Sequence, residues 1–236
     1  MGGTIAAVLL VAHVPYPAVY RQIPNQITVA RLVLAFVFFL VLNQYRFPHY
    51  ARWALLVAIA LFVIAAISDW LDGYLARKWK VESTFGRIMD PFCDKVLVIG
   101  AFIYLSGPRF VDPQHVEPPT LLGNIIPGNV ASGVYPWMVA LILARELLVT
   151  GIRDELESTG VRFGANFSGK LKLVFQVVAI PLILLIVWLD PRSGVSAIPG
   201  LALIRDILVY LTVAVTMLSG WPYVRSAMRS VKEKSS

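Results

Sequence analysis

Long apolar stretches alternate with short polar connections along the whole chain. Six stretches approach the ~20 mostly apolar residues that a helix needs to cross a bilayer. They cover residues 28–44, 52–72, 91–107, 134–153, 171–189 and 203–221. The connections between them are too short for a second folded domain. The pattern therefore predicts an all-α integral membrane protein with six transmembrane helices.

The two ends of the chain depart from this pattern. Residues 1–27 contain an apolar run but lack the basic start of a signal peptide, so we expect a short N-terminal interfacial segment. Residues 28–225 are expected to form one six-helix membrane domain, and residues 226–236 a basic cytoplasmic tail.

Composition agrees with a membrane location. Of the 236 residues, 58% are hydrophobic and only 15% are charged, unlike a soluble domain. The single cysteine, Cys93, excludes an intrachain disulfide and a cysteine-based metal cluster. The formal net charge is +7, but no basic soluble domain is present, so nucleic acid is not an expected partner.

Basic residues concentrate in alternate connections and in the C-terminal tail. One connection carries five of them, another carries four, and the tail carries four: Arg77, Lys78, Lys80, Arg87 and Lys95; Arg153, Arg162, Lys170 and Lys172; Arg225, Arg229, Lys232 and Lys234. The positive-inside rule then predicts that both termini lie in the cytoplasm. A bacterial inner membrane fits this layout best, and an organelle membrane is the alternative.

Four aspartates lie beside the apolar segments on the predicted cytoplasmic side. Asp69 and Asp72 are three residues apart, so they share a face at the end of the second span. Asp90 and Asp94 share a face at the start of the third. If these helices are antiparallel neighbours, four carboxylates converge and repel one another unless cations lie between them. Oxygen ligands suit Mg²⁺ or Mn²⁺, and two such ions would neutralise the four charges.

Each aspartate also has an ordinary structural interpretation. Asp90 precedes Pro91 and could be the N-cap of a helix that starts there. Asp72 precedes Gly73 and could mark the end of a helix. These alternatives explain single residues and leave the shared spacing of the four unexplained.

The spacing Asp69-x2-Asp72-Gly73-x2-Ala76-Arg77-x8-Gly86-x3-Asp90-x3-Asp94 resembles the signature of the CDP-alcohol phosphatidyltransferase family. The resemblance implies a metal-dependent, homodimeric membrane transferase of phospholipid biosynthesis that moves a substituted phosphoryl group from a CDP-linked donor to an alcohol. It implies that Asp69, Asp72, Asp90 and Asp94 hold the metal, and that Asp94 is also the general base. Residues implied to bind the CDP-lipid are Asn25, Thr28, Asp69, Gly73, Ala76, Arg77, Ser83, Thr84 and Gly86.

Some of these side chains have a second interpretation. Ser83 and Thr84 could instead be ordinary polar residues of a connection or helix cap. Arg31 lies one turn after Thr28. It could face the nucleotide, but we expect it to anchor the first span at the membrane surface.

The acceptor alcohol is indicated by basic residues later in the chain. Arg145 interrupts an apolar stretch, where a charge is costly unless it is paired or faces a wet cavity. A cluster of Arg145, Arg153 and Lys170 would bind a dianionic phosphate, because arginine offers two parallel donors and lysine a point charge. We expect Lys172, two residues from Lys170, to meet lipid head groups instead.

Three segments resemble family members whose acceptor is a glycerol phosphate: "IPNQITVARL", "ARELLVTGIRDEL" and "GKLK". The implied reaction joins CDP-diacylglycerol and sn-glycerol 3-phosphate to give phosphatidylglycerol phosphate and CMP, on the route to phosphatidylglycerol. One alternative is another acceptor, such as inositol phosphate, inositol or serine. A divalent-cation transporter and a prenyl-diphosphate enzyme are alternatives from other classes; the second would need an adjacent Asp-Asp pair, which the sequence lacks.

Overall fold

The computed structural model describes residues 18–79, 84–112, 130–158, 167–190 and 200–234, and all its regular elements there are helical. The elements are α1 (Ala18–Leu42), α2 (Trp53–Trp79), α3 (Thr84–Leu105), the short 3-10 helix η1 (Pro108–Phe110), α5 (Pro136–Ser158), α6 (Phe167–Leu189), α7 (Leu201–Leu218) and α8 (Trp221–Lys234). The predicted all-α class is thus confirmed for this part of the chain.

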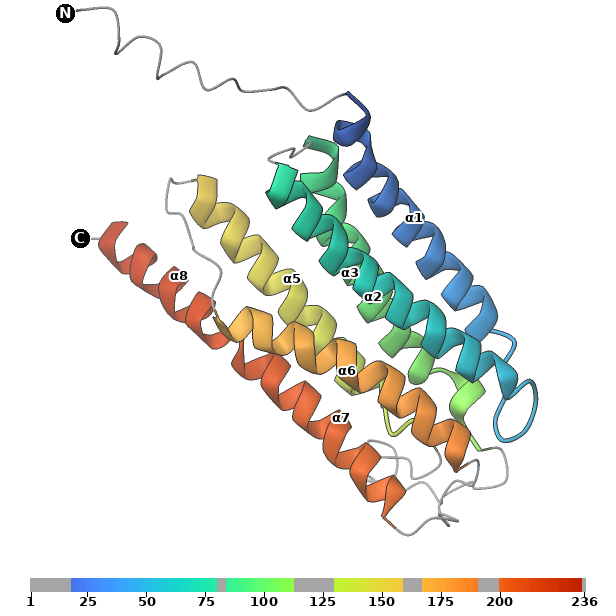
Figure 1. Ribbon diagram of the computed structural model, residues 1–236. Coiled ribbons are helices and arrows are strands. Elements are labelled where there is room, and N and C mark those ends of the chain that lie inside the picture. Colours follow the sequence, from blue (N-terminus) through green and yellow to red (C-terminus); the bar gives the residue numbers. More distant parts are fainter. Residues whose placement is uncertain (1–17, 80–83, 113–129, 159–166, 191–199, 235–236) are drawn as a thin grey trace, which may run out of the picture.

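The helices from α1 to α7 form an up-and-down bundle (Figure 1). Helix α1 packs against both α2 and α3, α6 packs against α2 and α7, and α5 contacts α7 and α8. Because successive helices reverse direction, the start of α1, the end of α2, the start of α3 and the end of α5 meet at the upper end of Figure 1. Helix α8 continues from α7 towards that same end.

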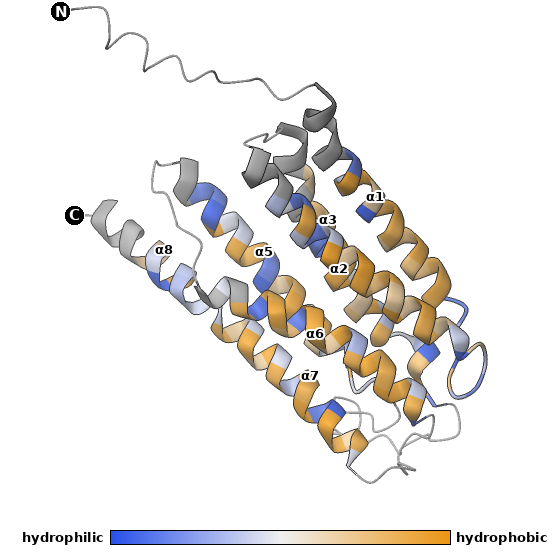
Figure 2. Cartoon of the chain, in the orientation of Figure 1, coloured by the Kyte–Doolittle hydropathy of each residue, from blue (hydrophilic) through white to orange (hydrophobic). Residues whose placement is uncertain are grey.

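The outer faces of the bundle are apolar, as expected where lipid replaces water. Phe36 and Ile64 are both at least half exposed, whereas the core contains fully buried rings such as Phe38 and Phe62. Figure 2 shows that hydrophobic residues predominate along the middle of the helices. Among the described residues, three helical segments are long and apolar enough to cross a membrane: Trp53–Tyr74, Leu171–Leu189 and Leu201–Met228.

The six predicted apolar stretches coincide with α1, α2, α3, α5, α6 and α7, although several helices extend beyond them. Helix α1 starts at Ala18, and α8 forms a helix where we expected a basic tail. The count of six membrane spans and the division into an interfacial segment, a membrane domain and a tail stay predictions.

Helix boundaries exclude the ordinary interpretations of two aspartates. Helix α2 continues to Trp79, so Asp72 and Gly73 do not end it. Helix α3 starts at Thr84, so Asp90 is not an N-cap. Both aspartates lie inside helices, as the shared-face interpretation requires.

A glycine allows α3 to approach α1 closely. The Phe39 ring of α1 stacks on Tyr104 of α3 with centroids 5.3 Å apart and lies directly against Gly100. A Cβ atom at Gly100 would overlap that ring. Small residues at such contacts allow membrane helices to pack tightly.

We therefore predict that Gly100→Leu destabilises the bundle. The added side chain would force α1 and α3 apart, and the midpoint of thermal unfolding in detergent should fall by about 5 °C. Gly151→Leu is the matched control, because a Cβ atom at Gly151 meets nothing within 4 Å. Equal midpoints for the two variants would contradict this account of the helix contact.

Candidate functional site

A buried arginine lies where α1, α2 and α3 meet. The Arg31 side chain is 1% exposed. Its Nη1 donates a hydrogen bond to Oδ1 of Asp94 at 3.0 Å and also contacts Oδ1 of Asp69. Its Nη2 lies 3.7 Å from Oδ2 of Asp72. One guanidinium group therefore joins carboxylates from two other helices.

The expectation that Arg31 anchors the first span at the membrane surface is wrong. A buried guanidinium is costly without counter-charges, and the three aspartates supply them. The sequence signal was the spacing itself, because Arg31 is one turn after Thr28 and faces the same side of α1. Thr28 is also buried, and its carbonyl accepts a hydrogen bond from Sγ of Cys93, the residue before Asp94.

Three predicted metal-binding aspartates converge in this arrangement. Asp72 is buried, whereas the Asp69 and Asp94 side chains are each 33% exposed, so the cluster is open on one side. Three carboxylates and one guanidinium leave a formal net charge of −2. We call these four residues the aspartate cluster.

The aspartate cluster fits a hard divalent cation by charge and by ligand type. It offers carboxylate oxygens, which Mg²⁺ and Mn²⁺ prefer, and its net charge calls for further positive charge. Arg31 lies among the carboxylates, and within the described residues no three acidic, histidine or cysteine side chains stand close enough together to form a metal-ligand group. The Asp90 side chain is outside the described part of the chain.

The structure describes only some of the other residues that are predicted to bind the CDP-lipid. Gly73 is half-buried next to Asp72. Ser83 lies outside the described residues. Five more lie within helices, but their surroundings are outside the described part of the structure: Asn25, Ala76, Arg77, Thr84 and Gly86. Their roles stay predictions.

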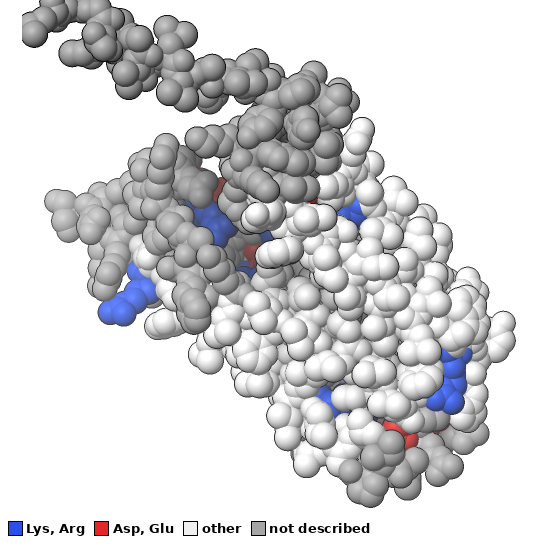
Figure 3. Space-filling model, in the orientation of Figure 1, with Lys and Arg blue, Asp and Glu red and all other residues white. Residues whose placement is uncertain are grey.

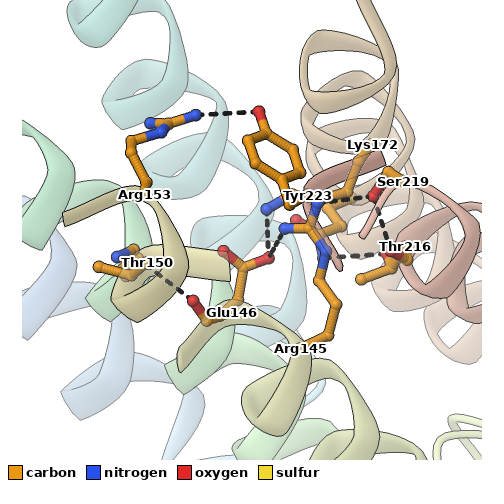
Figure 4. A network of polar contacts seen from close by, with 10 residues as sticks. Arg145, Glu146, Thr150, Arg153, Lys172, Thr216, Ser219 and Tyr223 are labelled. Atoms are coloured by element: carbon orange, nitrogen blue, oxygen red, sulfur yellow. Dashed lines mark hydrogen bonds and ion pairs between the residues drawn. The ribbon is translucent and has the colours of Figure 1, made fainter. Parts of the chain in front are cut away.

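A second polar network lies on α5, with contributions from α3, α6, α7 and the segment that starts α8 (Figure 4). Arg145 and Glu146 are both buried, and Nη1 of Arg145 donates to Oε1 of Glu146 at 3.0 Å. Nζ of Lys172 contacts the same oxygen. Nη2 of Arg145 donates to Oγ of Ser219 at 2.8 Å. The charge that interrupts the apolar stretch at Arg145 is thus paired inside the protein.

The expectation that Lys172 meets lipid head groups is wrong. Its side chain is 12% exposed and points inward to Glu146. Lys170, which we expected to reach inward, has a side chain outside the described residues.

Two further cations complete this network. Nη2 of Arg153 donates to the hydroxyl of Tyr223 at 3.0 Å. Nζ of Lys95 donates to Oγ1 of Thr150 at 2.6 Å, and that hydroxyl donates to the carbonyl oxygen of Glu146. Lys95 directly follows Asp94 in α3, so it joins the two groups of charges. The members are Lys95, Arg145, Glu146, Thr150, Arg153, Lys172, Ser219 and Tyr223, and we call them the cationic network.

The cationic network carries four cations and one carboxylate, a formal net charge of +3. Lys95 and Arg145 both lie close enough to repel the Lys172 ammonium group. A group of cations with too few counter-charges favours a bound anion. Figure 3 shows acidic and basic side chains side by side in a recess towards the upper end, whereas the middle of this face is uncharged.

A helical bundle with apolar faces carries a net negative cluster and a net positive network next to each other, which defines a membrane protein with a charged polar site. The chain belongs to the CDP-alcohol phosphatidyltransferase family, whose sequence pattern matches residues 21–218. The family resemblance in the sequence is therefore confirmed, and the protein is a phosphatidyltransferase of a generally metal-dependent family.

Bacterial relatives cover nearly the whole chain. A Cereibacter sphaeroides protein named CDP-diacylglycerol–glycerol-3-phosphate 3-phosphatidyltransferase is 30% identical over 90% of this chain and 98% of its own length. A Bacillus subtilis protein of the same name is 31% identical over 89% of this chain and 97% of its own length. A Mycobacterium tuberculosis protein named probable phosphatidylglycerophosphate synthase is 34% identical over 89% of this chain and 83% of its own length.

We predict that Arg31→Gln destabilises the protein. Removing the guanidinium leaves three carboxylates that repel one another, at a cost of roughly 2–3 kcal/mol, or about 5–10 °C in the thermal midpoint. The loss should be larger in EDTA than in Mg²⁺, because an added cation can replace the missing charge. Arg46→Gln, at an exposed arginine beyond the far end of α1, is the control. An equal fall of the thermal midpoint in EDTA and in Mg²⁺ would contradict the proposal that the aspartate cluster fits a cation.

Proposed function

We propose that this protein transfers the phosphatidyl group from CDP-diacylglycerol to sn-glycerol 3-phosphate, giving phosphatidylglycerol phosphate and CMP. The observation that carries the proposal is that the aspartate cluster and the cationic network are neighbours, joined through Asp94 and Lys95. The reaction needs such a pair, because the donor carries a diphosphate and the acceptor a phosphate. The names of the bacterial relatives support the same donor and acceptor.

The aspartates would hold the metal. We assign Asp69, Asp72, Asp90 and Asp94 as ligands of Mg²⁺ or Mn²⁺, with two ions per site. Bound there, such ions neutralise the charge of the diphosphate and of the departing nucleotide. Binding of the CDP-lipid is assigned to Asn25, Thr28, Asp69, Gly73, Ala76, Arg77, Ser83, Thr84 and Gly86.

Asp94 is the residue that we assign as the general base. It takes the proton from the acceptor hydroxyl as the hydroxyl oxygen attacks the β-phosphorus of CDP-diacylglycerol. A new P–O bond forms, the bond to the CMP oxygen breaks, and CMP leaves with the electron pair. Because Arg31 donates to Asp94, it orients this carboxylate. Arg77 would bind the phosphate of the leaving nucleotide.

The acceptor phosphate would bind in the cationic network. Arg145, Arg153 and Lys170 are the residues that the sequence indicates, and the inward position of Lys172 adds a fourth cation to the proposal. Glu146 pairs with two of these cations and leaves the remaining positive charge for the dianion. Inositol has no charge and serine has a single carboxylate, so neither supplies the dianion that this positive charge favours. The network therefore favours a phosphorylated acceptor, and the relatives' names favour glycerol 3-phosphate over inositol phosphate.

The membrane layout follows from the same chemistry. We propose six spans, with both termini and the active site at the cytoplasmic face of a bacterial inner membrane, and a homodimeric assembly. The lipid donor would enter sideways between helices, with its phosphates level with the charged end of the bundle, and the soluble acceptor would arrive from the cytoplasm. A cation transporter is disfavoured, because transporter sites lie near the membrane midplane, whereas Asp69 and Asp72 lie near one end of the apolar segment Trp53–Tyr74.

We predict that Asp94→Asn abolishes CMP release. The amide cannot accept the hydroxyl proton, so the rate should fall by at least about 100-fold. The measurement is CMP formation by purified protein with CDP-diacylglycerol, sn-glycerol 3-phosphate and Mg²⁺. Asp154→Asn, at an exposed carboxylate near the end of α5, should retain the wild-type rate. Full activity of the Asp94→Asn variant would contradict the assignment of Asp94 as the general base.

We predict that Arg145→Gln weakens acceptor binding selectively. Loss of a charge-assisted contact to phosphate should raise the KM for sn-glycerol 3-phosphate by roughly 10- to 100-fold and leave the KM for CDP-diacylglycerol within about twofold. Arg205→Gln is the control, since Arg205 pairs with Asp206 and with the carbonyl of Ala131, outside the network. An unchanged acceptor KM in the Arg145 variant would count against the assigned phosphate site.

A further inference from the structure

We infer that the junction between α7 and α8, residues 219–223, positions the two arginines of the acceptor site, with Tyr223 as the principal positioning residue. This inference rests on the proposed function and extends it, since no sequence motif pointed to these residues. Ser219 and Tyr223 are polar side chains that are 3% and 1% exposed. Each accepts a hydrogen bond from a different arginine of α5.

Ser219 and its neighbour hold the first arginine. The Ser219 hydroxyl donates to the carbonyl oxygen of Thr216 at 2.6 Å, which directs its lone pairs to accept from Nη2 of Arg145. A Cβ atom at Gly220 would lie 3.4 Å from Cγ and 3.5 Å from Nε of Arg145. The backbone of the junction therefore runs alongside the part of the Arg145 side chain from Cγ to Nε.

Tyr223 holds the second arginine in two ways. Its hydroxyl accepts from Nη2 of Arg153 at 3.0 Å, and its ring centroid is 5.6 Å from the guanidinium carbon of the same side chain. Figure 4 shows the tyrosine between Arg153 and the group around Arg145. A ring contact and a hydrogen bond together fix both the plane and the direction of the guanidinium group.

The distance between the two arginines along α5 explains why two residues are needed to hold them. Arg145 and Arg153 are eight residues apart on α5, or about 12 Å along the helix axis. Their partners are only four residues apart, with Ser219 in the turn between α7 and α8 and Tyr223 at the start of α8. One short segment therefore holds both arginine side chains, as binding of one small phosphorylated molecule requires.

Ser219 and Tyr223 hold the two arginines without reducing the positive charge of the acceptor site. A serine and a tyrosine hydroxyl are neutral acceptors, so they orient the guanidinium groups without cancelling their charge. A carboxylate in either place would pair with the arginine and compete with a phosphate. Among the described contacts of the network, Glu146 is the carboxylate that neutralises part of its charge, by bridging Arg145 and Lys172.

Tyr223→Phe tests the inference, because it keeps the ring and removes only the hydroxyl. We expect the KM for sn-glycerol 3-phosphate to rise by roughly tenfold, while kcat and the KM for CDP-diacylglycerol stay within about twofold. The thermal midpoint should stay close to that of the wild type. Tyr210→Phe, at a tyrosine of α7 that is 42% exposed, is the matched control and should leave every value unchanged.

A second variant and a second acceptor complete the test. Ser219→Ala should raise the same KM through Arg145, and the double variant should raise it further. An unchanged acceptor KM for Tyr223→Phe would overturn the inference. So would an equal rise in both KM values together with a lower thermal midpoint, which would mark the tyrosine as a general structural residue.

Measuring wild type and Tyr223→Phe with inositol 1-phosphate separates this inference from the proposed function. If the wild type used only inositol 1-phosphate, and the variant raised that KM, the glycerol phosphate acceptor would be wrong and the positioning role would stand. Activity with unphosphorylated acceptors alone would overturn both.

Discussion

The charged end of this bundle depends on one buried guanidinium group among three carboxylates. Arg31 is almost fully enclosed and can carry its charge there only because α2 and α3 bring Asp69, Asp72 and Asp94 against it. The same contacts tie α1 to both neighbouring helices, so the ion pairs that fix the packing also collect the acids. We propose that the net negative charge of these four residues attracts further cations.

The cationic network has the opposite imbalance of charge, because its basic side chains outnumber its one carboxylate. One carboxylate, Glu146, is shared by Arg145 and Lys172, while Arg153 and Lys95 bind only neutral hydroxyl oxygens among the contacts described above. Neighbouring residues of α3 face the two groups: Asp94 contacts Arg31, and Lys95 contacts α5. A negative cluster that attracts cations and a positive network that attracts an anion thus lie next to each other. That juxtaposition suits two phosphate-bearing substrates that must meet.

The sequence predicted the helical fold and the meeting of Asp69, Asp72 and Asp94, because both follow from the spacing of residues. The metal-binding role of these aspartates stays a prediction. Apolar stretches of span length gave the helices, and i, i+3 and i, i+4 steps put the acids on shared faces. Arg31 was misjudged because it stands near the start of the predicted apolar stretch 28–44, where an arginine has the same local pattern whether it faces lipid or core. Helix α1 extends back to Ala18, so Arg31 lies in the middle of the helix. Lys172 was misjudged because residues two apart point in different directions, and only the packing of α6 decides which one faces inward. Ser219 and Tyr223 carry no sequence signal, since their roles arise from contacts between segments about 70 residues apart along the chain.

The most direct test of the central claim is binding of Mn²⁺ to the purified protein, followed by electron paramagnetic resonance. The account predicts that CDP-diacylglycerol strengthens Mn²⁺ binding, that two ions bind per chain, and that Asp69→Asn removes at least one of them. Binding of Mn²⁺ that is equally tight in the wild type and in this variant, with or without the CDP-lipid, would contradict the claim that these carboxylates form a cation site for the diphosphate.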